Sequence, residues 1–173
     1  TYHEVYEDWR ADPEGFWMRA ARALDWERAP GRASDASRAP FHRWFPDGRL
    51  NACHNAVDRH VAAGRGDQAA LVHISAMTGT ESRFTFRELR DQVARLAGAL
   101  RALGVGRGDR VVIYMPMVPE AVFAMLACAR LGAIHSVVFG GFAARELAMR
   151  IDDARPTLLL TASCGLEPGR VVD

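Results

Sequence analysis

The stretch that decides the fold is RVVIYMPMVPEAVFAMLACARLGAIHSVVF, residues 110–139. It opens with a β-branched run, Arg110–Tyr114, of the kind that is buried in a parallel sheet. A helix that is apolar on nearly all sides begins at Pro119 and ends near Gly132. A second apolar strand, Ile134–Phe139, follows. The stretch therefore predicts one βαβ unit with a buried crossover helix.

The same alternation continues on both sides of this unit. Downstream, Ala143–Ala154 predicts a helix and Thr157–Thr161 a strand. Upstream, Thr85 and Glu88 form a capping box that begins a helix ending at Gly104. Two short strands, Ala70–Ser75 and Arg83–Thr85, precede that helix. We predict an α/β fold with parallel βαβαβ layers, an incomplete piece of a larger domain.

The first third of the chain predicts a helical extension. Tyr2 to Trp9 places apolar residues at helical spacing, and Asp12-Pro13-Glu14 begins a second helix. The remaining predicted elements are a loop or linker over 27–40, a short hairpin over Phe41–Leu50 and a helix from Asn51 to about Ala63. We expect an N-terminal extension over 1–64 and the beginning of a second, truncated domain over 65–173.

Composition excludes several classes of function. The chain has 173 residues, 49% hydrophobic and 25% charged, which is typical of a soluble globular protein. Its net charge of +1 favours neither nucleic acid nor an anionic membrane as a partner. All 22 basic residues are arginine. A GC-rich genome accounts for the missing lysine, but its absence excludes a Walker-type lysine, a Schiff base and an amine nucleophile.

The cysteines and apolar stretches indicate no disulfide framework, metal site or membrane segment. Three cysteines without a CxxC pair predict no disulfide framework, and they suit a reducing, cytoplasmic location. Cys53, His54 and His60 lack metal-ligand spacing, so we assign no metal site. The most apolar stretch, Ala121–Ala129, is far shorter than the roughly 20 residues that span a bilayer, so we expect no membrane segment. A start at Thr1 suggests a piece of a longer protein.

Two segments follow predicted strands, where open α/β sheets bind ligands. Gly140 and Gly141 lead into a helix, and their missing side chains let an anion approach the backbone, although a tight turn explains them equally well. The second segment, Ser163–Arg170, includes Arg170, which is either a phosphate ligand or a surface arginine. Cys164 has no activating base in the sequence, and His135 is interpreted as a core histidine.

Three runs of sequence resemble the N-terminal part of acetyl-CoA and propionyl-CoA synthetases, members of the adenylate-forming superfamily. They are Tyr114–Ala121, Leu126–Ala133 and His135–Phe142. The resemblance covers nearly the whole chain, because other runs are similar to the family's N-terminal extension: Phe16-Trp17, Leu24–Trp26, Trp44–Gly48, Leu50-Asn51 and Asp58–His60. Details in three segments look more like the propionate than the acetate branch: Cys53–Arg59, Arg150–Ala154 and Ser163–Arg170.

The resemblance implies a two-step reaction. ATP and a short carboxylate form an acyl-adenylate with loss of pyrophosphate, assisted by Mg²⁺, and the CoA thiol then displaces AMP. It also implies that Gly140 and Gly141 lie beside the pantetheine arm of CoA. The loop containing Glu167, Pro168, Gly169 and Arg170 would lie beside its nucleotide, with Arg170 as the phosphate contact. The acetate branch often has arginine where this chain has Glu167, which puts a second cationic contact in doubt.

The resemblance places the catalytic parts beyond Asp173. These are the phosphate loop with its lysine, the acyl pocket, most of the Mg²⁺ site and the C-terminal domain with the adenylation lysine. We therefore assign no catalytic residue to this chain and expect it to be inactive without the remainder of the polypeptide. Acetate- and acetoacetate-specific ligases are alternatives within the family. A stand-alone, non-enzymatic α/β module that binds a ligand or a partner is the alternative from another class.

Overall fold

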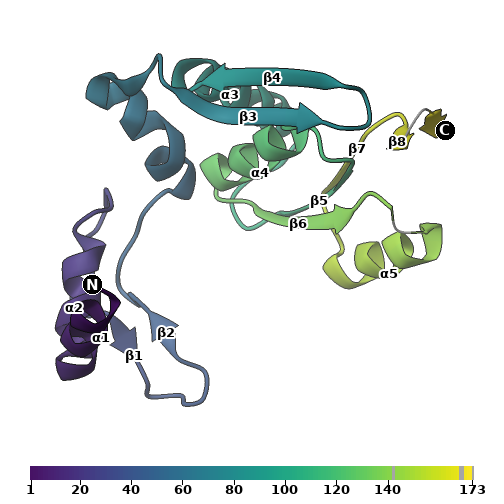
Figure 1. Cartoon of the computed structure of the whole chain (residues 1–173). Coiled ribbons are helices and arrows are strands. Elements are labelled where there is room, and N and C mark those ends of the chain that lie inside the picture. The colour runs from purple at the N-terminus through teal and green to yellow at the C-terminus, as the bar shows by residue number, and fades with distance from the viewer. Residues whose placement is uncertain (142, 168–169, 173) are drawn as a thin grey trace. The chain divides into compact units, whose positions relative to one another are not determined.

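The structure is a computed structural model that describes residues 1–141, 143–167 and 170–172 (Figure 1). The chain divides into two units, Thr1–Asn51 and Ala52–Asp173. The first two helices therefore belong to one unit, and the parallel sheet belongs to the other. The sequence-based boundary between residues 64 and 65, which separates the N-terminal extension from the second domain, stays a prediction.

The first unit is built on two capped helices, α1 (Tyr2–Ala11) and α2 (Pro13–Ala21). Asp12 begins α2 by accepting a 2.9 Å hydrogen bond from the Gly15 amide. A short strand β1 (Ser34–Asp35) pairs antiparallel with β2 (Arg43–Trp44). The prediction of a hairpin within Phe41–Leu50 is therefore wrong in its pairing, because β2 finds its partner in the segment predicted as a loop.

The second unit begins with two π-helical segments, η1 (His54–Asp58) and η2 (Val61–Arg65), inside the helix predicted from Asn51. Strands β3 (Ala69–Ser75) and β4 (Thr80–Thr85) then form an antiparallel hairpin, so the return strand begins earlier than predicted. The capping box at the start of α3 (Phe86–Ala102) is confirmed. The Thr85 amide bonds the Glu88 carboxylate at 2.8 Å, and this bond lowers the pKa of Glu88.

The predicted parallel sheet is confirmed in its three strands. They are β5 (Arg110–Met115), β6 (Ile134–Phe139) and β7 (Leu158–Thr161), in the order β6-β5-β7. The central strand is covered on both faces, since Val111, Val112 and Ile113 have no exposed surface. Figure 1 shows α4 (Pro119–Leu131) and α5 (Ala144–Ala154) on opposite sides of this sheet.

The main core lies where α3 and α4 pack on one face of the sheet and on the β3–β4 hairpin. Phe84 of β4 meets Phe123 of α4 edge to face, with ring centroids 5.2 Å apart. The buried hydrophobic residues of this core are Cys53, Val57, Leu89, Val93, Ala97, Leu100, Val105, Val111, Ile113, Phe123, Ala124, Ala127, Cys128 and Ala133. The apolar character of α4 on most sides is thereby explained.

The chain after β7 contains a further hairpin. Strand β8 (Gly165–Glu167) pairs antiparallel with β9 (Arg170–Val172). The sequence predicts a loop here, because Gly165, Pro168 and Gly169 are turn residues and each strand is only three residues long. Runs this short carry no periodic signal.

Candidate functional site

The carboxyl edge of the parallel sheet is the best candidate for a binding site. Met115 of β5 lies opposite Phe139 of β6, and Tyr114 lies opposite Thr161 of β7, so all three strands end at the same edge. The chain leaves β5 for α4 and leaves β6 for α5, and these helices cover opposite faces. Neighbouring strands whose connections diverge in this way form a topological switch point, where open α/β sheets bind ligands.

The turn after β6 holds two of the predicted site residues, Gly140 and Gly141. A Cβ atom added at Gly140 would lie 2.8 Å from the Met115 carbonyl oxygen and 3.1 Å from the Pro116 nitrogen. One added at Gly141 would lie 2.6 Å from the Phe139 ring. Close packing against the end of β5 therefore requires glycine at position 140 whether or not a ligand binds.

The other predicted site residues lie around the β8–β9 hairpin. Glu167 and Arg170 are register partners, one ending β8 and the other beginning β9. Pro168 and Gly169 lie outside the described residues. The hairpin follows β7, whereas the Gly140–Gly141 turn follows β6, and β5 separates these two strands. Strand spacing places the two strands roughly 10 Å apart, so both candidate segments leave the same edge on either side of β5.

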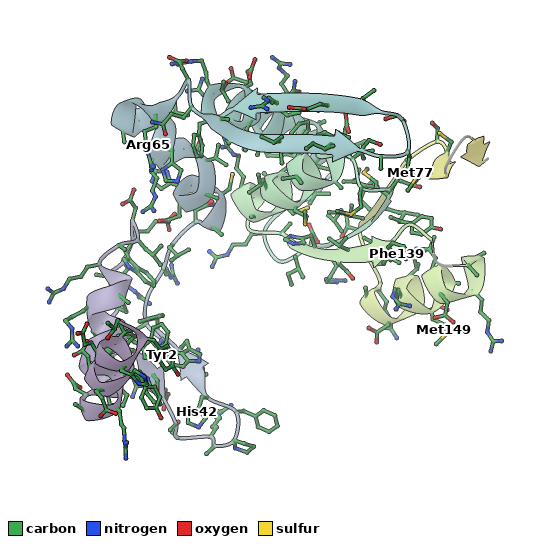
Figure 2. All side chains as sticks on the ribbon, in the orientation of Figure 1. Tyr2, His42, Arg65, Met77, Phe139 and Met149 are labelled. Carbon is green, nitrogen blue, oxygen red and sulfur yellow. The ribbon has the colours of Figure 1, made fainter. Side chains whose placement is uncertain are left out.

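The segment after β5, which we call the Pro116–Val118 loop, completes this edge. The ring nitrogen Nε2 of His73, on β3, lies 3.1 Å from the Met117 carbonyl oxygen. The Met117 side chain is 86% exposed and that of Phe139 is 66% exposed. Figure 2 shows Phe139 at the carboxyl end of β6. This edge thus presents exposed apolar residues beside backbone groups.

A polar cluster that the sequence gives no reason to expect joins η1 to α4. The Nη2 atom of Arg130 donates to both carboxylate oxygens of Asp58, at 2.6 and 2.7 Å, and its Nε donates to the Cys53 sulfur at 3.4 Å. Burial raises the pKa of the Cys53 thiol, although Arg130 opposes the shift. A protonated, buried thiol is a poor nucleophile, so this cluster has a structural role.

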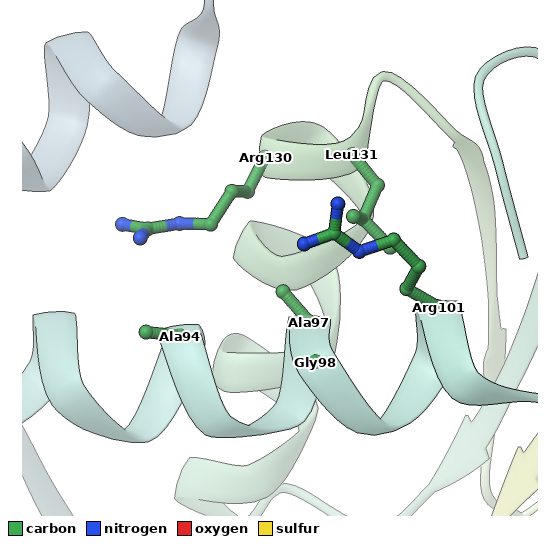
Figure 3. A pocket seen from close by; sticks show the side chains of 6 residues that line it. All are labelled: Ala94, Ala97, Gly98, Arg101, Arg130 and Leu131. Atoms are coloured by element: carbon green, nitrogen blue, oxygen red, sulfur yellow. The ribbon is translucent and has the colours of Figure 1, made fainter.

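Arg130 also borders a groove of about 370 Å³ between α3 and α4. Figure 3 shows its lining residues: Ala94, Ala97, Gly98, Arg101, Arg130 and Leu131. Arg101 lies in the last turn of α3 and Arg130 in the last turn of α4, where cations complement the negative ends of helix dipoles. The groove contains no carboxylate or hydroxyl group, and helix electrostatics account for both arginines.

In the described part of the chain, no three His, Cys, Asp or Glu side chains gather closely enough to hold a metal ion. No helix of that part combines the length and apolar character needed to cross a membrane.

Comparison with known proteins decides the family. The sequence model of AMP-binding enzymes matches residues 58–172, and that of the acetyl-coenzyme A synthetase N-terminus matches residues 2–56. The chain belongs to the AMP-binding enzyme family. It corresponds to the N-terminal part of a short-chain acyl-CoA synthetase, as its sequence motifs indicate.

Three relatives show how much of a member of this family the chain represents. It is 50% identical over 162 residues to human acyl-CoA synthetase short-chain family member 3, mitochondrial, covering 94% of the chain and 24% of that protein. The chain is 52% identical over 167 residues to acetyl-coenzyme A synthetase of Streptomyces avermitilis, and the match covers 96% of the chain and 26% of that protein. The chain is 48% identical over 172 residues to propionate–CoA ligase of Escherichia coli, and the match covers 99% of the chain and 27% of that protein. The chain therefore spans about a quarter of these relatives.

Proposed function

We propose that this chain forms the CoA-side part of an AMP-forming ligase that activates propionate or acetate. ATP and the carboxylate would give an acyl-adenylate and pyrophosphate, and the CoA sulfur would then displace AMP to give the thioester. The supporting observation is the family membership over both halves of the chain, combined with a switch-point edge that carries the candidate CoA segments.

Within that edge, the Gly140–Gly141 turn is proposed to lie beside the pantetheine arm. The segment with Glu167, Pro168, Gly169 and Arg170 is proposed to lie beside the nucleotide of CoA. A guanidinium group binds phosphate through parallel N–H bonds, which makes Arg170 the proposed phosphate contact. Backbone at a glycine turn suits the uncharged pantetheine arm, because its amides need hydrogen-bond partners rather than charge.

The chemistry of bond formation is proposed to lie in the remainder of the polypeptide. This chain has no lysine, so both lysines that the resemblance implies, that of the phosphate loop and that of adenylation, would lie in the remainder. The magnesium ion is likewise proposed to be bound mainly by that remainder, as the resemblance to the family implies. We further propose that residues 1–64 act as the extension and 65–173 as the start of the AMP-binding domain. Three free cysteines support a reducing location such as the cytoplasm.

Initial rates of acyl-CoA formation test this proposal. Full-length protein is expected to convert propionate or acetate faster than acetoacetate, with release of AMP. Residues 1–173 alone are expected to form no acyl-CoA under the same conditions. Turnover by the isolated chain would overturn the assignment of catalysis to the remainder. CoA binding without turnover by the full-length protein would favour a non-enzymatic module.

A further inference from the structure

We propose that His73 is a positioning residue for the CoA half-reaction, acting by holding the Pro116–Val118 loop in place. The inference rests on the proposed function, because it names a residue that supports the proposed pantetheine-side turn. His73 lies outside every motif on which the family resemblance was based. Its contact is with the Met117 carbonyl, so its effect on the Gly140–Gly141 turn passes through the loop.

The loop depends on few contacts for its position. Inside it, the Val118 amide donates to the Pro116 carbonyl at 2.8 Å, which shapes the turn without anchoring it to the rest of the unit. The Met117 side chain is 86% exposed and supplies almost no packing. The Val118 carbonyl accepts a 3.1 Å hydrogen bond from the Ala121 amide of α4, the helix that follows directly in sequence. The bond from His73 Nε2–H to the Met117 carbonyl, at 3.1 Å, ties the middle of the loop to β3, an element distant in sequence.

His73 is mounted on a well-supported element. Val72 and Ile74 are 46% and 73% exposed, whereas His73 is half-buried, so it points to the side of the strand opposite both neighbours. The same hairpin is packed onto α4 through the Phe84–Phe123 ring contact. A donor on such a strand fixes its acceptor more firmly than a donor on a free loop.

The other side of the loop meets the proposed CoA segment. The Gly140 backbone lies so close to Met115 and Pro116 that an added Cβ would come within 2.8 Å of the Met115 carbonyl oxygen. Because the Gly140 backbone lies directly against the first residue of the loop, we expect a shift at Pro116 to displace the Gly140–Gly141 turn. His73 thus connects the β3–β4 hairpin to the pantetheine side of the site.

The test uses three variants of the full-length protein. His73→Leu removes the donor, His73→Gln retains an N–H donor, and Ile74→Ala is a control on the exposed face of the same strand. Hydrogen exchange of residues 114–123 reports the loop directly. The Michaelis constant for CoA and the rate of pyrophosphate exchange separate the two half-reactions. Loss of the one hydrogen bond is expected to change KM for CoA about five-fold.

His73→Leu is expected to speed exchange in residues 114–123 and to raise KM for CoA about five-fold, while pyrophosphate exchange is unchanged. His73→Gln should restore both properties, and Ile74→Ala should change neither. Exchange in His73→Leu equal to that in Ile74→Ala would overturn the proposal, as would an equal loss in both half-reactions. If wild-type protein forms no acyl-CoA, the proposed function fails, but the exchange measurement still decides whether His73 holds the loop.

Discussion

At the scale of single residues, the two glycines after β6 show what sequence can and cannot reveal. A glycine pair following a strand predicts either a ligand contact or a tight turn, and no pattern in one sequence separates them. Packing supplies the missing information, because Gly140 lies against the backbone that leaves β5. The Cys53–Asp58–Arg130 cluster is a similar case, since Arg130 lies more than 70 positions from both of its partners in sequence.

Gly140→Ala is expected to lower the free energy of unfolding by about 1–3 kcal/mol, because its Cβ would overlap the Met115 carbonyl oxygen. Gly98→Ala is the matched control. Gly98 lies inside α3 with no atom within 4 Å of an added Cβ, so alanine there should stabilise by about 0.5–1 kcal/mol. Urea unfolding of both variants measures the difference. Equal midpoints would show that the turn after β6 is looser than described.

Alkaline pH is expected to destabilise the fold through its buried thiols. Burial raises the pKa of Cys53 and of Cys128 above the ordinary value of 9.0. A raised pKa means that the folded state holds its protons more tightly, so this stabilisation is complete below pH 9 and is lost as pH rises through the raised values.

Urea unfolding between pH 7 and pH 10.5 tests this expectation. A Cys53→Ser, Cys128→Ser double variant should lose less stability over the range than the wild-type chain, because its hydroxyl groups do not titrate there. The comparison uses slopes, so the lower absolute stability of the variant does not affect it. Parallel slopes for the two proteins would contradict the assignment.

At the scale of elements, the strands and helices with strong periodic or capping signals follow from the sequence. Apolar runs predict β5, β6 and α4, and the Thr85–Glu88 box predicts the start of α3 within one residue. The short strands do not follow from the sequence, because each has only two or three residues and depends on a partner elsewhere in the chain. These strands are β1, β2, β8 and β9. Tertiary pairing, rather than local preference, determines them.

Helix ends give a prediction at this scale. Helix α4 ends at Gly132 with φ of 72°, whereas α5 ends at Arg155 with φ of 44°, a left-handed conformation that costs a residue with a Cβ about 1–2 kcal/mol. Arg155→Gly should therefore stabilise the fold by about 0.5–1 kcal/mol after the added freedom of the unfolded chain is counted. Gly132→Ala, the reverse change, should destabilise it. Thermal unfolding measures both variants. A melting temperature of Arg155→Gly at or below that of Gly132→Ala would contradict the strain at Arg155.

At the scale of the whole molecule, the sheet is open at its sides. The described residues include no strand on the outer side of β6, where Ile134, Val137 and Phe139 are 56%, 52% and 66% exposed. Strand β6 carries no lysine, proline or carboxylate that would block a further strand. The sequence predicts an incomplete sheet because three parallel strands with their helices resemble a piece of a larger layered domain. The exposed apolar residues of β6 agree with that prediction.

This open edge predicts self-association of the isolated chain. Sedimentation should show larger species as the concentration of residues 1–173 rises. Val137→Lys should suppress them, because a charge on the edge disfavours strand addition. Leu103→Lys is the control, since Leu103 is 65% exposed but lies beyond the end of α3, away from the sheet. Equal suppression by both variants would attribute association to general hydrophobicity instead.

The central claim is that this chain supplies CoA contacts to a two-step ligase, and Arg170→Ala in the full-length protein tests it most directly. Arg95→Ala, an exposed arginine on α3, is the matched control. Loss of one charge-assisted phosphate contact predicts a rise in KM for CoA of roughly tenfold, with pyrophosphate exchange unchanged. An unchanged KM for CoA, or an equal loss in both half-reactions, would contradict the claim.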